Sequence, residues 1–332
     1  MEVPSNIDEF LEVAKAFTFN DPDKNGSNDT VGFTLDFINS QEFIMSAFDL
    51  HQYGGSLFNV PDSDGEYRIP EKMKGYIPYL TFLRKMYTEK ALEQEFYVNK
   101  VYDSENKFNQ GKVGMVRMHG TGLYRALAPT PPEKMTLGLP FPNSKGERVL
   151  YMPLAVWGGW CITNQAQNVD KIMEFMNWAF SHEGILLVGL GIKGVHYETY
   201  DFEKRFITRT EEQSKLTAIE LSPYMEFCRA YKGLCLYPEG IDTIENIERF
   251  NQQTKHFWDN ANIIAVSTCG LIEENQFKTD NADLITKKES MEAKYVACEI
   301  TLEEFVNFLE TEYYPAVKTL EEAYIAAMKS KK

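Results

Sequence analysis

The stretch that most constrains this chain is a run of oxygen-bearing side chains at residues 21–30. Oxygens recur at every second position, and Gly26 stands at the sixth place, where a calcium-binding loop makes a sharp turn that a Cβ would obstruct. The first six positions match the pattern D-x-[DN]-x-[DN]-G. The alternating side chains are those of Asp21, Asp23, Asn25, Ser27 and Asp29. Because Ca²⁺ takes roughly six to eight oxygen ligands, this spacing predicts a calcium loop.

The second half of the stretch departs from an EF-hand. The twelfth place, where an EF-hand has a bidentate glutamate, is Gly32, and Phe33 to Phe37 have the pattern of a strand rather than of an exiting helix. We therefore predict a calcium loop between a helix and a strand, and not a calcium sensor. The alternative is an Asp/Asn/Gly turn without metal, because these residues form turns readily.

The residues before the loop predict an amphipathic helix at 5–17. Ser5 followed by Asp8 fits a capping box, and apolar residues then recur with helical spacing. The residues that share the apolar face are Ile7, Phe10, Leu11 and Ala14. This helix runs directly into the acidic loop.

Composition excludes several classes of protein. The 332 residues suffice for one large or two ordinary domains, and 22 Phe, 18 Tyr and 4 Trp exclude a disordered chain. A net charge of −15 argues against a nucleic acid as partner. No apolar run approaches the ~20 residues that span a bilayer. The first residues lack the basic start and apolar core of a signal peptide.

The cysteines indicate neither a disulfide framework nor a zinc site. Their number, five, is odd, and no C-x-x-C pair occurs. They are Cys161, Cys228, Cys235, Cys269 and Cys298. Buried free thiols are therefore the default expectation.

Helical and strand patterns alternate along the chain, which predicts α/β layers with helices packed on a sheet. We expect strands at 33–37, 113–120, 137–141 and 150–155, and helices at 42–48, 70–87, 100–110, 168–180, 242–262 and 320–328. Residues 280–298 read as a loose acidic-basic segment with some helix. In the helix at 168–180, the side chains predicted to point inward are Ile172, Phe175, Met176 and Ala179, and Trp178 is predicted to be core.

One short motif is rejected. Gly189, Gly191 and Gly194 match G-x-G-x-x-G, but a dinucleotide fingerprint must follow a strand and open a helix. This one follows a helical pattern and runs into a non-helical segment. The glycines are expected to end a helix.

Several stretches, taken in order, resemble the family 1 extracellular solute-binding proteins of ABC transporters, which include oligosaccharide-binding lipoproteins such as the alginate-binding proteins. They are the acidic loop at 20–30, Gly111–Met115, Trp160–Thr163, Phe175–Gly184, the G-x-x-G-V-x-Y-like stretch Gly191–Glu198, and the final helices at 301–332. Each motif is weak to moderate alone, and the ordered set is fairly specific. The resemblance covers nearly the whole chain.

The resemblance implies a type II periplasmic-binding-protein-like, two-lobed α/β fold. Residues 1–145 would form a second-lobe part with the calcium loop, 146–235 a hinge crossing and a returning first-lobe part, and 236–332 C-terminal helices on the second lobe. Such proteins carry a signal peptide, a lipid-anchored cysteine and most of a first lobe before the loop. In this chain the loop begins at residue 21, so most of the first lobe would be missing. We therefore expect a fragment, a mis-started gene or half of a split receptor.

The resemblance also implies a function. The protein would be extracytoplasmic, at the cell surface, and would act as a monomer that captures a sugar or other small solute by hinge bending and delivers it to an ABC transporter permease. Calcium would be structural, held by Asp21, Asp23, Asn25 and Asp29, with the backbone carbonyl of Ser27.

Solute-binding proteins hold sugars by stacking aromatic rings on them and by hydrogen-bonding their hydroxyls. Candidates are Trp157 and Trp160, which flank two glycines, and His119 and Tyr124, which follow the strand at 113–118. Arg117 is a candidate to bind an acidic substituent bidentately. For the two tryptophans, a place in the core is the open alternative.

Two other functions were weighed. One is a calcium-binding, non-catalytic interaction protein or fragment without a small ligand. The other is a glycoside hydrolase, which needs a pair of carboxylates across a cleft. Because the chain has 49 Asp and Glu residues, a candidate catalytic pair of carboxylates can always be found, and their number decides nothing. The sequence has no G-x-S-x-G, P-loop or other catalytic pattern. We therefore predict a protein that is not an enzyme.

Overall fold

The computed structural model describes residues 2–22, 24–51, 57, 60–118, 135–153, 161–201, 206–220, 244–266 and 271–330. The chain divides into two compact units. The first unit comprises Met1–Met118, Thr136–Ala155 and Lys255–Lys332, and the second comprises His119–Met135 and Val156–Thr254. The division predicted from the sequence, at residues 145 and 235, stays a prediction.

Parallel strand pairs form the β structure of the first unit. Strand β1 pairs with β2 so that Phe33 lies opposite Met115, and β3 pairs with β6 so that Tyr151 lies opposite Ile264. The strands are β1 (Val31–Thr34), β2 (Val113–Val116), β3 (Val149–Pro153) and β6 (Asn262–Val266). Parallel pairing requires a crossover between the strands, and each crossover here contains several helices.

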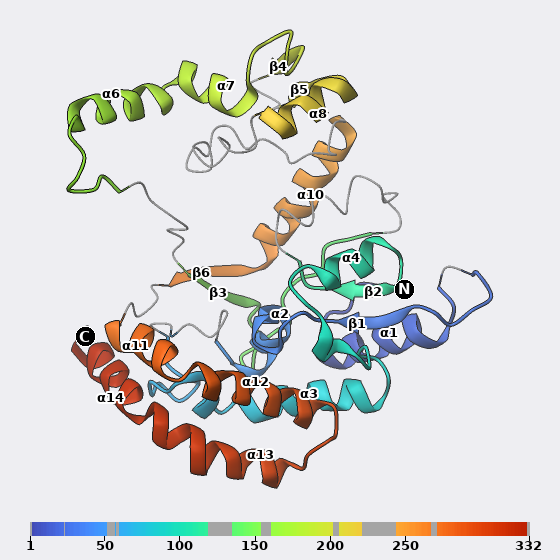
Figure 1. Ribbon diagram of the computed structural model, residues 1–332. Coiled ribbons are helices and arrows are strands. Elements are labelled where there is room, and N and C mark those ends of the chain that lie inside the picture. Colours follow the sequence, from blue (N-terminus) through green and yellow to red (C-terminus); the bar gives the residue numbers. More distant parts are fainter. Residues whose placement is uncertain are drawn as a thin grey trace. The chain divides into compact units, whose positions relative to one another are not determined.

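Helices cover these strands and carry most of the core. Helix α1 packs against β1, while α12 lies along α3 and packs against α13 (Figure 1). The helices of the first unit are α1 (Ile7–Phe19), α2 (Glu42–Met45), α3 (Tyr76–Thr88), α4 (Asp103–Asn109), α11 (Ile272–Asp280), α12 (Ala282–Val296), α13 (Leu302–Phe308) and α14 (Tyr314–Ser330). At the centre, the rings of Phe10, Phe33, Phe43 and Phe141 pack with centroids 5.2–6.0 Å apart.

Two predicted helix starts in the first unit were wrong in position. The N-cap of α1 is Asn6, not Ser5: its side chain accepts from the backbone N–H of Glu9, whose carboxylate accepts in return from Ser5. Pro70 opens only a short 3-10 turn at Pro70–Lys72, and α3 begins at Tyr76.

Two predicted segments were wrong in type. Residues 137–141 are extended but pair with no strand among the described residues, although Phe141 donates its N–H to the carbonyl of Phe43. Residues 280–298 are not loose. They contain the whole of helix α12, in which Lys288, Glu292 and Tyr295 are buried.

The C-terminal helices exist as the sequence predicts, but the last one, α14, begins at Tyr314 and not at residue 320. Thr301 and Glu304 form a capping box at the start of α13. Pro315 does not interrupt the chain, because it lies in the first turn of α14, which continues α13 through a π-helical turn at Leu309–Tyr313. Among the described helices, none is long and apolar enough to cross a membrane.

The second unit has a small described core around Leu190, Tyr197 and Ile207. Its elements are α6 (Val169–Ala179), α7 (His182–Leu190), the antiparallel pair β4 (Thr199–Asp201) and β5 (Phe206–Thr208), and α8 (Glu211–Glu220). Helix α10 (Ile244–Asn260) spans the boundary between the units. Gly191 ends α7 and has φ 85°, which confirms that the rejected glycine motif terminates a helix.

The predicted helix at 168–180 exists as α6, but its predicted burial was wrong. Ile172 and Phe175 are 36% and 49% exposed, and Trp178 is only half-buried. Only Ala179 of the helix is buried. An amphipathic pattern fixes the helix and its apolar face, whereas burial requires a neighbour that covers this face.

Candidate functional site

A groove of about 1170 Å³ runs across the first unit. One wall is the segment Leu35–Ser40, which follows the carboxyl end of β1, and other walls come from Phe96–Asn99, the turn at Pro70 and helix α12. Ligands of open α/β folds commonly bind outside the carboxyl ends of the strands. The volume is ample for an oligosaccharide.

Two aromatic side chains in the wall of the groove are half exposed. Phe37 follows β1 and is 50% exposed, and Tyr97 lies in a 3-10 turn and is 52% exposed. Rings of this kind present an apolar face on which a sugar can stack. Sequence reasoning missed both. For Phe37 a signal was present, because it is an aromatic residue at the carboxyl end of the strand predicted at 33–37.

Polar contacts hold both segments in position. The side-chain amide of Asn99 donates to Thr34 Oγ1 at 2.9 Å and to the carbonyl of Leu35 at 3.0 Å, which ties the turn of Tyr97 to the end of β1. The carboxylate of Asp36 accepts the N–H groups of Tyr102 and Ser104 at 2.9 and 2.8 Å. The groove wall is therefore largely pre-formed.

A buried ion network forms another part of the wall. Lys288 Nζ lies 2.9 Å from Glu71 and 3.3 Å from Glu292. Glu292 also accepts from the Tyr76 hydroxyl and from the Asn39 amide. Burial alone would lower the pKa of Lys288, but attraction to the two carboxylates outweighs it and raises this pKa well above its usual value.

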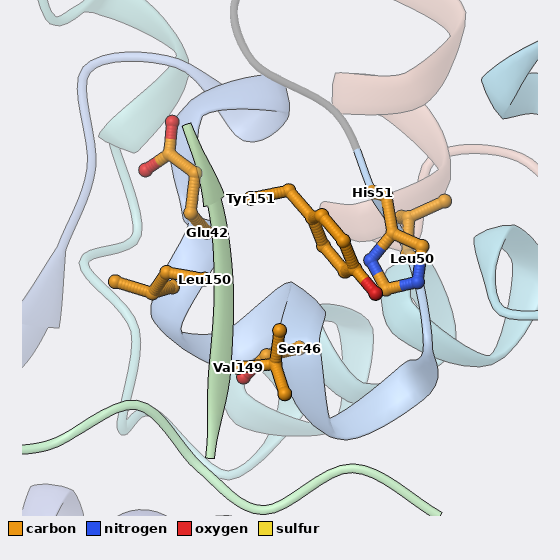
Figure 2. Close-up of a pocket in the computed structure, with 7 residues that line it drawn as sticks. All are labelled: Glu42, Ser46, Leu50, His51, Val149, Leu150 and Tyr151. Atoms are coloured by element: carbon orange, nitrogen blue, oxygen red, sulfur yellow. The ribbon is translucent and has the colours of Figure 1, made fainter. Parts of the chain in front are cut away.

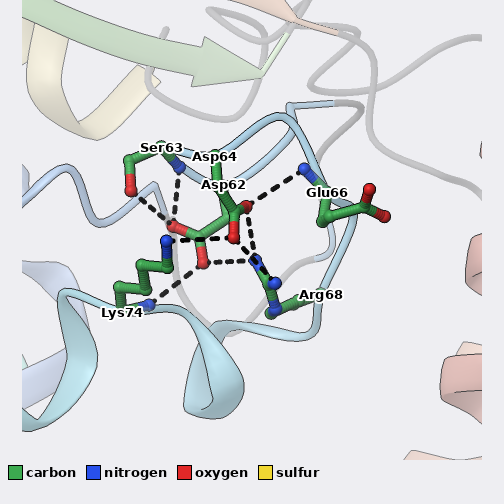
Figure 3. A network of polar contacts seen from close by, with 6 residues as sticks. All are labelled: Asp62, Ser63, Asp64, Glu66, Arg68 and Lys74. Carbon is green, nitrogen blue, oxygen red and sulfur yellow. Dashed lines mark hydrogen bonds and ion pairs between the residues drawn. The ribbon is translucent and has the colours of Figure 1, made fainter.

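A second polar network fixes the turn that precedes this wall (Figure 3). Buried Asp62 accepts from Arg68 at 2.7 Å and from the backbone N–H of Lys74 at 3.1 Å. Arg68 also forms a two-point contact with Asp64, at 2.7 and 2.9 Å. A hydrogen bond of 2.8 Å from Asp62 N to the carbonyl of Glu66 closes the turn.

A small cavity of about 10 Å³, roughly the space of one water molecule, lies beside α2 and β3 (Figure 2). Here the rings of His51 and Tyr151 meet edge to face, with centroids 4.2 Å apart. Burial lowers the pKa of His51 to about 4, although Asp49 and Asp62 oppose the shift. His51 is therefore neutral at pH 7.

This pKa predicts an acid-sensitive fold. In the unfolded chain the His51 side chain takes up a proton near its ordinary pKa of 6.5. In the folded protein it stays neutral down to about pH 4. Stability should therefore fall as the pH drops from 6.5 to 4, by on the order of 3 kcal/mol. In urea unfolding across this window, His51→Phe should flatten the pH slope. The same substitution at exposed His256 should leave it intact, and an equal slope in both variants would contradict the assignment.

Of the predicted sugar-binding residues, only Arg117 lies within the described part of the chain. It follows β2, and its Nε and Nη2 lie 3.2 and 3.4 Å from the carboxylate of Glu42. Burial raises the pKa of Glu42, and Arg117 counteracts this shift. Trp157, Trp160, His119 and Tyr124 lie outside the described residues, and their roles stay predictions.

The predicted calcium loop is an ordered turn between α1 and β1. Asp21 accepts the N–H groups of Asn25 and Gly26 at 3.0 and 2.9 Å, and the Asn25 amide donates to Asp29 at 3.2 Å. Gly26 has φ 87°, so the sharp turn falls at the sixth position as predicted. The base of the loop is fixed by the bond from Gly32 N to Thr18 Oγ1 at 2.9 Å.

These residues fit a cation in part. The side chains of Asp21, Asn25 and Asp29 gather around one turn, but Asn25 turns its nitrogen toward Asp29 and would have to rotate to offer its oxygen. Among the described residues, no three His, Cys, Asp or Glu side chains are grouped to hold a metal. Asp23, a predicted ligand, lies outside them.

Solved structures show which fold these units represent. The alginate-binding protein AlgQ2, crystallised without calcium, matches with a TM-score of 0.62 and 19% identity over 99% of this chain and 68% of its own. The substrate-binding protein FusA of an S. pneumoniae ABC transporter, in complex with kestose, matches with a TM-score of 0.63 and 13% identity over 100% of this chain and 68% of its own. The chain therefore has the α/β fold of type II periplasmic-binding-protein-like solute-binding proteins.

The family follows from the sequence comparison. The model of the bacterial extracellular solute-binding protein family matches residues 1–185, more than half of the chain. The chain belongs to this family, as the resemblance predicted.

Two relatives come from Bacillus subtilis (strain 168). The polygalacturonan/rhamnogalacturonan-binding protein YtcQ is 24% identical over 230 residues, which is 67% of this chain and 45% of YtcQ. Lipoprotein LipO is 24% identical over 282 residues, which is 80% of this chain and 52% of LipO. The chain spans about half the length of these curated relatives.

Proposed function

We propose that this protein binds an oligosaccharide outside the cytoplasm and delivers it to an ABC importer without chemistry on the ligand. The observation that carries the proposal is the groove at the carboxyl end of β1, in which Phe37 and Tyr97 present half-exposed rings. Membership of the solute-binding family supports it, as do relatives whose names record carbohydrate ligands. The protein would act as a monomer whose ligand favours a closed state that a permease recognises.

Phe37→Ala tests the groove. Because Phe37 is half exposed, its removal should weaken binding of the preferred oligosaccharide at least about tenfold while costing little stability. The measurement is titration calorimetry, with a thermal-shift screen of oligosaccharides to find the ligand, since a ligand that binds only the folded state raises the melting temperature.

Phe19→Ala is the matched control, because Phe19 is 48% exposed on α1 and does not line the groove. Its affinity should equal that of the wild type. Equal affinity in the Phe37 variant would remove the groove from the proposal. A protein that responds to no oligosaccharide would favour the alternative, a calcium-binding interaction protein.

We further propose that the loop at residues 21–29 holds a structural calcium ion through Asp21, Asp23, Asn25 and Asp29, with the carbonyl of Ser27. Its support is the regular spacing of oxygens, the positive φ of Gly26 and the anchoring of both loop ends on α1 and β1. The loop joins α1 to β1, and both elements contribute residues to the core, so the ion would stabilise the junction of helix and strand.

Asp29→Asn should abolish calcium stabilisation, because it removes a charged oxygen but keeps the side-chain shape. The wild-type melting temperature should rise from chelator to millimolar calcium, and that of the variant should not. Glu12→Gln on α1, where Glu12 is exposed and paired with Lys15, should respond like the wild type. A calcium response that survives in the Asp29 variant would place the ion elsewhere.

A further inference from the structure

The groove is rich in carboxylates. The described residues that line it include six acidic side chains and three lysines, and no arginine is among them. The acidic residues are Asp36, Glu71, Glu274, Glu289, Glu292 and Glu299, and the lysines are Lys278, Lys288 and Lys294. A ligand in the groove therefore meets an excess of negative charge.

Two of the three lysines are paired with glutamates, so they do little to neutralise the negative charge that a ligand would meet in the groove. Lys288 is buried between Glu71 and Glu292, and Lys278 lies 2.7 Å from Glu274. Lys294 is exposed at the rim, as are Glu289 and Glu299. At the rim an anionic ligand would meet one exposed lysine and two exposed carboxylates, so the charge of the wall would not compensate for its loss of hydration.

The arginine expected to meet an acidic substituent is already occupied. Arg117 follows Val116, which lies opposite Thr34 at the end of β1, so the arginine belongs to the same edge of the strand pair as the groove wall. Its guanidinium contacts Glu42. Bidentate recognition of a ligand carboxylate would have to break this half-buried ion pair.

From these contacts we propose that the groove takes an uncharged oligosaccharide and discriminates against chains that carry uronate groups. The proposal rests on the oligosaccharide function above and names its ligand class. Carboxylates accept hydrogen bonds from sugar hydroxyls, so the acidic wall suits a neutral ligand. The ligand would thus differ in charge from the one that the name of YtcQ records.

The experiment compares neutral and uronate oligosaccharides of equal length by titration calorimetry. It includes oligogalacturonate in its free-acid and methyl-esterified forms, which differ in charge and by one methyl group per esterified residue, and a chitosan oligosaccharide, which carries amines. We expect the tightest ligand to be neutral, with affinity at least tenfold above that of the best uronate chain. We also expect uronate binding to strengthen with added salt, because salt screens repulsion.

Other outcomes separate the two proposals. A uronate or an amine-bearing chain as the tightest ligand would overturn the inference and leave the oligosaccharide function standing. Binding of no oligosaccharide of any charge would overturn both.

Variants test whether the wall sets the preference. The double variant Glu289→Gln/Glu299→Gln should raise the affinity for uronate relative to neutral chains about threefold. Glu322→Gln, at an exposed carboxylate on α14 outside the groove, should leave this ratio at its wild-type value. An unchanged ratio in the double variant would show that the groove charge does not select the ligand.

Discussion

Lys288→Met is expected to lower the free energy of unfolding by about 3–5 kcal/mol, because it leaves Glu71 and Glu292 buried without their cation. Glu292 is only 1% exposed, so solvent cannot replace the lost charge. Urea unfolding measures the effect.

Lys287→Met is the matched control, one residue away on the same helix. Lys287 pairs with Glu312 at the surface, where both side chains are about half exposed. Such pairs contribute roughly 0–1 kcal/mol, so this variant should remain close to the wild type. Equal losses in the two variants would contradict the buried network.

Gly32→Ala is expected to cost about 3 kcal/mol or more, because the added methyl group has no space. A Cβ at this position would lie 2.1 Å from the carbonyl oxygen of Ala14 and 2.5 Å from its carbonyl carbon. Both are backbone atoms of α1, so no side-chain rotation relieves the clash. Either α1 or β1 must shift, and the loop that joins them shifts too. The free energy of unfolding measures the cost.

Gly138→Ala supplies the control for the added methyl group. Its Cβ would meet nothing closer than Val3 at 3.9 Å, which is ordinary van der Waals contact. Its stability should match that of the wild type within about 0.5 kcal/mol. A stable Gly32 variant would mean that α1 and β1 are not packed backbone to backbone.

Local sequence signals were sufficient where the structure is local. The acidic loop, the helical pattern that opens at Thr301 and the glycine that ends α7 each involve residues a few positions apart, and each was located from the sequence. The fold class and the family followed from ordered motifs along the chain. The N-cap of α1 was misplaced by one residue because Ser5 and Asn6 are both good capping residues.

Long-range contacts explain what the sequence did not reveal. From the sequence alone, the many charged residues at 280–298 suggest a segment exposed to solvent. In the structure Lys288 is buried against Glu71, which is 217 residues away in the chain. In α6 the opposite occurred: an apolar stripe was predicted to be inside, but Phe175 is half exposed. Periodicity reports which residues share a face, and only packing decides what covers that face.

The sequence by itself determined several of the helices, the turn at Gly26 and the family, because these depend on neighbouring residues and ordered motifs. Only the tertiary structure decided that Phe37 and Tyr97 line one groove, that Arg117 is held by Glu42, and that Lys288 lies between two buried carboxylates. Each of these facts joins side chains from separate parts of the chain. The free energies of burial and charge pairing that bring them together depend on spatial neighbours, which a linear pattern does not specify.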